Sequence, residues 1–302
     1  MLGMTPSTLS ATAPVSTSRL LLRGADLLLL AVAIVWGSSY GVAKAALAFY
    51  PVLGLLALRF ALAAALLALP AWCASGQAQR RAALWAGLPS GLLILAILLC
   101  ETYGVAQTQA SHAALLISLC VVFTPLVEWA WLGRRPAPAV WVCTAASLLG
   151  ALLLAGGWQG RFGLGDGLML AAAVLRALAV CAIARWARGV PALLLTVVQS
   201  AVVALGCLLL ASVLGGLPPL PQAGAFWGGV LYLALGCTVF AFAAQNWALK
   251  HATPSRVGLL MGSEPAWGAL FAMLWLGERL GPAGWAGGLL MLAAALWTLR
   301  AR

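Results

Sequence analysis

Long apolar runs alternate along this chain with short gaps that carry most of its charged, proline and glycine residues. A helix needs about 20 mainly apolar residues to cross the hydrocarbon core of a bilayer, and the sequence predicts ten such helices. The predicted spans cover residues 26–47, 52–74, 83–106, 111–132, 138–157, 164–186, 191–213, 224–248, 255–276 and 282–299. We therefore expect an all-α integral membrane protein with ten transmembrane helices.

Basic residues fall in alternate gaps, as the positive-inside rule requires if the number of spans is correct. One set of gaps holds twelve of them, and the opposite set holds only Arg161 and Arg279. The twelve are Arg19, Arg23, Arg80, Arg81, Arg134, Arg135, Arg185, Arg188, Lys250, Arg256, Arg300 and Arg302. This distribution predicts a multi-pass protein of the cell inner membrane with both termini in the cytoplasm.

The two halves of the chain repeat each other. Residues 131–141 (WLGRRPAPAVW) match residues 275–285 (WLGERLGPAGW) at seven of eleven positions, 144 residues apart. We assign one five-helix repeat to residues 26–157 and the other to residues 164–299, after a disordered cytoplasmic tail at residues 1–25. Because five is odd, the second repeat must enter the membrane from the opposite face, and inverted repeats of this kind are an architecture of transporters.

Composition excludes several classes of protein. With 64% hydrophobic and 8% charged residues, the chain is far from the roughly 25% charged residues of a soluble domain. Its net charge of +11 comes from basic gaps beside apolar runs, so we expect no nucleic-acid partner. The seven cysteines show no CxxC spacing, and we expect neither a metal nor a cofactor. There is no GxxxxGKS phosphate loop and no HExxH motif, and therefore no sign of ATP hydrolysis or of metallopeptidase chemistry.

Two charged residues lie near the middle of predicted spans, Arg176 in the sixth and Glu264 in the ninth. A charge at the bilayer centre costs at least ~2.5 kcal/mol, so each is a candidate functional residue. They could pair with each other in a bridge that only fixes helix packing, or meet the two ends of a zwitterionic substrate. The repeat places Trp36 opposite Arg176 and Cys120 opposite Glu264, which predicts a pseudo-symmetric central set.

Other polar and aromatic residues of the spans complete the candidate substrate-binding set, because aromatic faces with a few polar groups suit an amphipathic solute. They are Trp36, Ser39, Tyr40, Glu101, Tyr103, Ser118, Gln245, Trp247 and Ser263. Together with Glu101 and Tyr103, the residues Gln107, Ser111 and His112 could make an outer gate or a protonation site. A solvated loop edge explains Gln107 and His112 equally well. For Lys44, Arg59, Glu128 and Gln199 we favour a packing or interfacial role.

Several motifs together resemble a known family. They are WGSSYGVAKAAL in the first span, SHAALLISLCVVFTPL with WLGRRP in the first repeat, and SRVGLLMGSEPAWGALFAMLWLGERLGP in the second. The chain is similar over residues 26–299 to the EamA-type branch of the drug/metabolite transporter superfamily. The resemblance implies a central cavity lined by spans one, three, four, six, eight and nine, in a family composed mostly of exporters. Arg134 and Val121 depart from the family pattern, which usually has Glu and Pro there.

From these patterns we predict a secondary transporter that exports small amphipathic metabolites such as amino acids by alternating access. Its partners would be the lipid bilayer and a small-molecule substrate, with protons as the candidate coupling ion through Glu264 or His112. The sequence does not distinguish a monomer from a homodimer. The alternative function is a membrane-embedded enzyme, or a sensor that does not transport, built on the same helix bundle.

Overall fold

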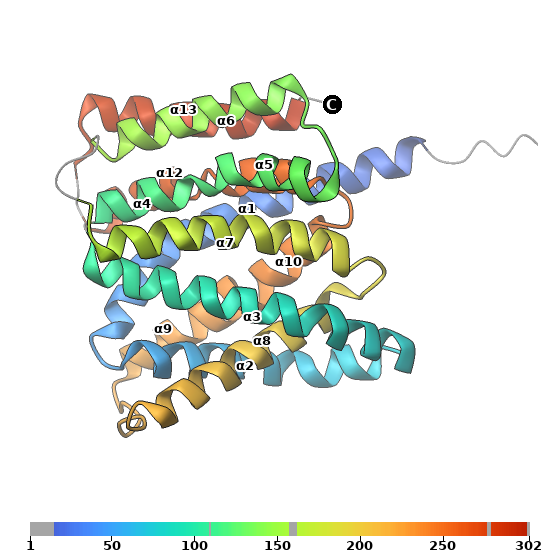
Figure 1. Cartoon of the computed structure of the whole chain (residues 1–302). Coiled ribbons are helices and arrows are strands. Elements are labelled where there is room, and N and C mark those ends of the chain that lie inside the picture. Colours follow the sequence, from blue (N-terminus) through green and yellow to red (C-terminus); the bar gives the residue numbers. More distant parts are fainter. Residues whose placement is uncertain (1–14, 109, 157–161, 277–278, 301–302) are drawn as a thin grey trace, which may run out of the picture.

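A computed structural model of the chain describes residues 15–108, 110–156, 162–276 and 279–300, and Figure 1 shows the whole chain. The side chains of residues 15–20, 40, 110–112, 114 and 275–276 also lie outside the described part. The helices are α1 (Val15–Leu47), α2 (Val52–Cys73), α3 (Gln77–Gln107), α4 (Ala110–Ser118), α5 (Cys120–Leu132), α6 (Pro138–Leu154), α7 (Leu164–Trp186), α8 (Ala192–Val213), α9 (Gly224–Ala234), the π-helix η1 (Leu235–Phe240), α10 (Ala241–Ala248), α11 (Pro254–Met261), α12 (Glu264–Leu276) and α13 (Pro282–Arg300).

These helices confirm the predicted all-α membrane fold. Over the described residues, nine segments are long and apolar enough to cross a bilayer, and Pro138–Leu154 is a shorter apolar helix that completes the ten. The first helix begins at Val15 rather than near residue 26, so part of the segment predicted as a disordered tail is helical. No proline or glycine lies between Val15 and Arg23 to end the helix there.

Two predicted spans are broken in the middle at equivalent places. The fourth span divides into α4 and α5 at Leu119, and the ninth divides into α11 and α12 at Gly262 and Ser263. Leu119 and Ser263 are 144 residues apart, the same offset that relates the two copies of the tryptophan-flanked motif. The eighth span keeps its direction but contains a π-helical turn, η1, between α9 and α10.

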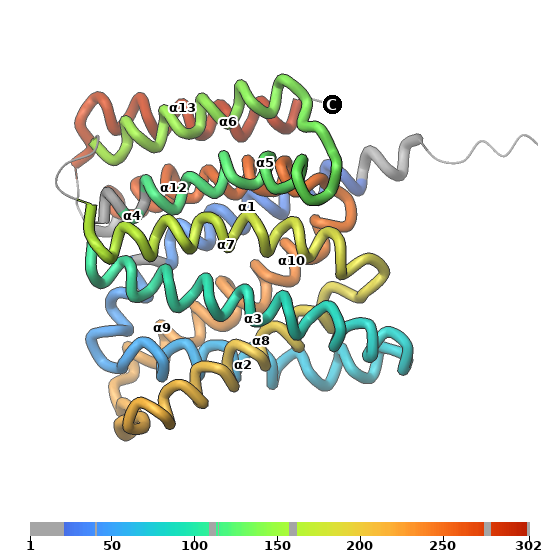
Figure 2. Tube along the Cα trace, viewed as in Figure 1, coloured from blue at the N-terminus to red at the C-terminus, as the bar shows by residue number. Residues whose placement is uncertain are grey.

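Figure 1 shows the helices stacked in layers, with α6 and α13 at one edge, α4, α5 and α12 beneath them, and α2 with α8 at the opposite edge. The α5–α6 and α12–α13 connections lie at opposite ends of the bundle, as inverted repeats require (Figure 1). In the tube of Figure 2, the first coloured turns of α1 and the last turns of α13 lie at the same end of the bundle. An even number of spans gives this result.

Glycines allow pairs of helices to come very close. A Cβ added at Gly287 of α13 would lie 2.6 Å from the backbone nitrogen of Leu154 and would also strike the carbonyl oxygen of Gly150 in α6. A Cβ at Gly37 of α1 would lie 2.8 Å from the carbonyl oxygen of Glu264. Small residues at such crossings are characteristic of packed membrane helices, and here they bring α1 directly against the start of α12.

Candidate functional site

A cavity of about 120 Å³ lies between the two halves of the bundle. Side chains from α1, α2, α3, α4, α5, α7, α10, α11 and α12 line it, so both repeats contribute. Most of the lining is apolar, including Ile94, Leu98 and Phe242, and the polar residues are few. An apolar cavity with a few convergent polar groups is the usual form of a small-molecule site.

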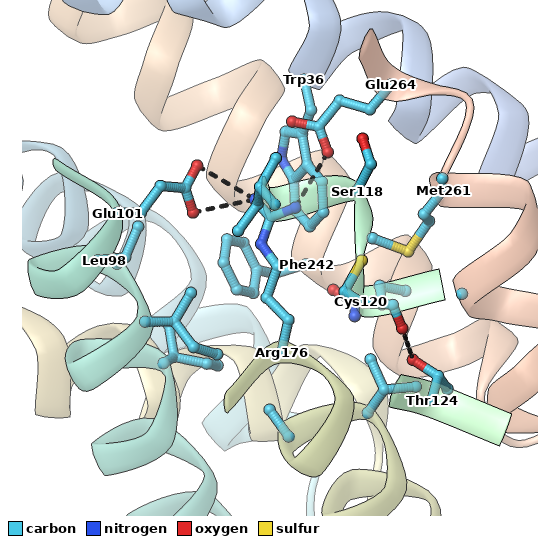
Figure 3. A pocket seen from close by; sticks show the side chains of 18 of the residues that line it. Trp36, Leu98, Glu101, Ser118, Cys120, Thr124, Arg176, Phe242, Met261 and Glu264 are labelled. Carbon is cyan, nitrogen blue, oxygen red and sulfur yellow. Dashed lines mark hydrogen bonds and ion pairs between the residues drawn. The ribbon is translucent and has the colours of Figure 1, made fainter. Parts of the chain in front are cut away.

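Three charged side chains meet in this cavity (Figure 3). Arg176 Nη2 donates to both carboxylate oxygens of Glu101, at 3.2 and 3.1 Å, and Nη1 donates to Glu264 Oε2 at 3.2 Å. The side chain of Arg176 is 21% exposed, against 14% for Glu101 and 6% for Glu264. An arginine paired with two carboxylates in a nonpolar setting forms strong, geometrically specific hydrogen bonds. One cation is therefore shared between a carboxylate of the first repeat and one of the second.

The guanidinium of Arg176 also lies against an aromatic ring. It is 5.7 Å from the ring centroid of Trp36, a distance at which a cation is attracted to the face of an indole. Trp36 in turn packs edge to face on Phe242, with centroids 5.6 Å apart, and its Nε1 donates to the carbonyl oxygen of Cys237 at 2.9 Å. Trp36 therefore connects the ion cluster to the π-helical turn η1.

The helix breaks position the carboxylate. Glu264 is the first residue of α12 and Cys120 the first residue of α5, so each stands directly after a break, and both line the cavity. The N-terminus of a helix carries a partial positive charge that favours a nearby carboxylate. The two breaks thus place equivalent residues of the two repeats, Glu264 and Cys120, in the central cavity.

Helices α3 and α7 touch at one end of the bundle. A Cβ added at Gly165 would lie 2.7 Å from the carbonyl carbon of Gln107, which means that the two backbones touch. Asp166 strengthens this contact, since its Oδ1 accepts a hydrogen bond from the hydroxyl of Thr108 and its Oδ2 accepts one from the backbone nitrogen of Gly163 at 2.8 Å.

A second, larger cavity of about 410 Å³ lies at the opposite end, where the α7–α8 connection is found (Figure 1). Ile183 lines both cavities, so they adjoin. Arg134, Arg188, Lys250 and His251 line the outer one, which we call the basic vestibule. Burial lowers the pKa of the Lys250 ammonium from its ordinary value, because a low-dielectric environment disfavours the charged form. The central cavity therefore faces the end of the bundle that carries most of the basic residues.

The model of the EamA-like transporter family matches the chain twice, over residues 23–156 and 163–300. These two segments coincide with the two halves of the bundle and together cover nearly all of its helices. The chain belongs to the EamA-like transporter family. It is accordingly a multi-pass membrane transporter of the drug/metabolite type, whose partners are the bilayer and a small-molecule substrate.

The fold of this EamA-like transporter occurs in 29 chains of solved structures. One of them, a crystal structure described only as that of a protein, superposes with a TM-score of 0.75 and 21% sequence identity. The match covers 90% of this chain and 94% of the other. No curated protein sequence is found to be similar to the chain. At this level of identity the solved structure supports the fold alone.

Most residues predicted for the site of this EamA-like transporter come together in the central cavity. The cavity is lined by Trp36, Ser39, Glu101, Ser118, Arg176, Gln245 and Glu264. The predicted central set of four also meets there, because Cys120 lines the cavity beside the other three. The side chains of Tyr40 and His112 lie outside the described residues.

Three predicted residues lie elsewhere. Tyr103 is 38% exposed on the outside of α3, because it is two residues beyond Glu101 and so falls on another face of the helix. Trp247 comes two residues after Gln245, which lines the cavity, and so lies on another face of the helix. Its ring packs on that of His251, with centroids 4.5 Å apart. Ser263 is buried in the α11–α12 break, where its hydroxyl donates to the carbonyl oxygen of Leu260 at 2.7 Å.

Two charged residues for which the sequence favoured a packing or interfacial role have specific contacts in the structure. Arg59 of α2 lines the central cavity, so the second span joins the six implied by the family resemblance. Glu128 of α5, only 3% exposed, accepts hydrogen bonds from the backbone nitrogen of Ser255, at 2.9 Å, and from its hydroxyl, and so caps the first turn of α11. The depth of each residue within a span was a signal for both, since charges inside a membrane are rarely without a role.

Proposed function

We propose that this EamA-like transporter is a secondary exporter of small amphipathic metabolites such as amino acids, working by alternating access in the cell inner membrane. The observation that carries the proposal is the ion cluster of Arg176, Glu101 and Glu264, which joins the two repeats inside a largely apolar cavity. A charged cluster between two halves that can move against each other provides polar contacts for a solute and a link between the halves.

The shape of the access path supports export. The cavity shares Ile183 with the basic vestibule, and α3 and α7 touch at the other end of the bundle. The positive-inside rule assigns the basic end to the cytoplasm. A metabolite made in the cell would therefore reach the site from the vestibule, and the α3–α7 contact would have to open to release it. Since the fold has inverted repeats, exchange of conformation between the halves would open that end.

A carboxylate that gains and loses a proton is one way to couple the cycle to a proton gradient. Glu264 is the candidate, because it stands at a helix break and is less exposed than either of its partners in the cluster. Protonation would weaken its bond to Arg176 and loosen the link between the repeats.

Flux of labelled leucine and phenylalanine in proteoliposomes tests this function. The wild-type protein should move at least one of the two, and an imposed pH gradient should change the rate. Glu264→Gln preserves the size of the side chain but removes its charge, and we expect it to lower flux by about tenfold or more, because a hydrogen bond to a charged group is lost. Membrane insertion of the variant should be unchanged.

Gln77→Asn is the control, since Gln77 is an exposed residue at the start of α3 and is not among the residues that line the central cavity. Normal flux in Glu264→Gln would demote Glu264 to a packing role. Flux that does not respond to the pH gradient would exclude proton coupling.

A further inference from the structure

The second arginine of the central cavity, Arg59, has a different set of partners from Arg176. Its Nε donates to the hydroxyl of Thr238 at 2.6 Å, and its Nη2 donates to the carbonyl oxygen of Cys237 at 3.0 Å. Both acceptors are neutral and belong to the π-helical turn η1. Among the described residues, no carboxylate lies within ion-pair distance of Arg59. The guanidinium is therefore fixed in position without being neutralised by direct contact.

A guanidinium offers five N–H groups, and only two of those of Arg59 are used by the described residues. The side chain is partly exposed and lines the cavity, so the remaining donors are accessible from the space where a solute would sit. Arg176, by contrast, already donates to two carboxylates. Of the two cations in the cavity, Arg59 is the one with donors available for a new anionic partner.

The equivalent position of the second repeat carries a neutral side chain. Helices α2 and α8 begin at Val52 and Ala192, 140 residues apart, and the same offset places Gln199 opposite Arg59. Gln199 joins its neighbours with a neutral amide: its Nε2 donates to Ser90 Oγ at 2.9 Å, and its Oε1 accepts from Asn246 Nδ2 at 2.8 Å. Hydrogen bonds of a neutral amide thus connect α8 to α3 of the first repeat and to α10 of the second.

We propose that Arg59 binds an acidic group of the substrate, so that the compounds this protein moves carry a carboxylate at one end. This inference rests on the proposed transport function. A guanidinium held in a fixed orientation matches the two oxygens of a carboxylate. The apolar body of the solute would lie against Ile94, Leu98 and Phe242, which line the same cavity.

The test compares labelled phenylalanine with phenylalaninamide, which lacks the acidic group, in proteoliposomes. The variant Arg59→Gln copies the residue of the second repeat. We expect it to lower phenylalanine flux by about tenfold or more relative to phenylalaninamide flux, the effect of losing one charged hydrogen bond. Lys44→Gln, which removes an exposed cation of α1 that is not among the cavity-lining residues, should change neither flux. An equal fall for both compounds, or no change for either, would overturn the role of Arg59.

A binding measurement separates this inference from the transport function. Benzoate should raise the melting temperature of the purified wild-type protein more than benzamide does, and Arg59→Gln should lose that preference. Wild-type protein that moves no compound but shows the benzoate preference would refute transport and retain Arg59 as an anion site. If Arg59→Gln fails to fold, Arg59→Lys keeps the charge and should keep a weakened preference for benzoate. The same preference for benzoate in wild type and variant, or none in wild type, would contradict the proposal.

Discussion

At the scale of single residues, the central cavity contains two arginines that are stabilised in different ways. Arg176 is held by Glu101 and Glu264, one carboxylate from each repeat, and lies against the ring of Trp36. Arg59 is held by neutral groups of η1. The first arrangement links the halves of the protein, and the second leaves a cation facing the cavity.

Removing Arg176 should destabilise the protein because it leaves two carboxylates in a nonpolar environment without their cation. Breaking one partner of such a buried pair costs about 3 kcal/mol or more. We therefore expect Arg176→Met to lower the thermal unfolding midpoint in detergent, and the triple variant with Glu101→Gln and Glu264→Gln to recover most of the loss. An unfolding midpoint equal to that of wild type in Arg176→Met would show that the cluster carries little stability.

The pairing of Arg176 with Glu264 was predictable from sequence, because charges are few within the spans and each must find a partner. The part played by Glu101 was not specified, since its distance from Arg176 depends on how α3 packs against α7. Arg59 was missed for a related reason. A cation eight residues into α2 could extend to the interface or turn into the bundle, and only the position of η1 decides between these.

At the scale of helices, the span boundaries followed from the sequence, because the transfer of an apolar run into lipid is a local property. The interruptions followed only in part, because Pro265 signals the break of the ninth span, which lies just before it. Leu119 lies at the break between α4 and α5 although it is neither proline nor glycine. The π-helical turn η1 is fixed by contacts from distant helices, since Trp36 and Arg59 both donate to the carbonyl oxygen of Cys237. Such contacts between helices are not encoded in hydropathy.

The crossing of α6 and α13 gives a test at this scale. Gly287→Ala would drive its methyl group into the backbone of α6 at Gly150 and Leu154, and overpacking of this kind costs about 1–3 kcal/mol. Gly288→Ala is the matched control, because an added Cβ there meets no described atom within 4 Å. We expect only Gly287→Ala to lower the thermal unfolding midpoint. Equal effects of the two variants would contradict the close crossing.

At the scale of the whole molecule, the two repeats are related by inverted insertion, and the related positions differ in chemistry. Glu264 corresponds to Cys120, Arg176 to Trp36, and Arg59 to Gln199. Each repeat supplies one arginine and one glutamate to the cavity, but at positions that do not correspond: the second repeat supplies Arg176 and Glu264, and the first supplies Arg59 and Glu101. A bound solute would therefore meet a different set of groups from each half.

In the proposed cycle, the cavity between the halves is the transport path and opens to the two faces in turn. Cys120 lines this cavity and is partly exposed, so a variant that keeps it as the sole cysteine reports on access. A variant that keeps only Cys207, which is 0% exposed, is the control.

The deciding measurement is the rate at which a membrane-impermeant methanethiosulfonate reagent labels Cys120 from each face of sealed vesicles. We predict rapid labelling from the face of the basic vestibule, slower labelling from the opposite face, and a decrease in both rates when a transported compound is present. Labelling of Cys120 no faster than that of Cys207 from either face would contradict the account.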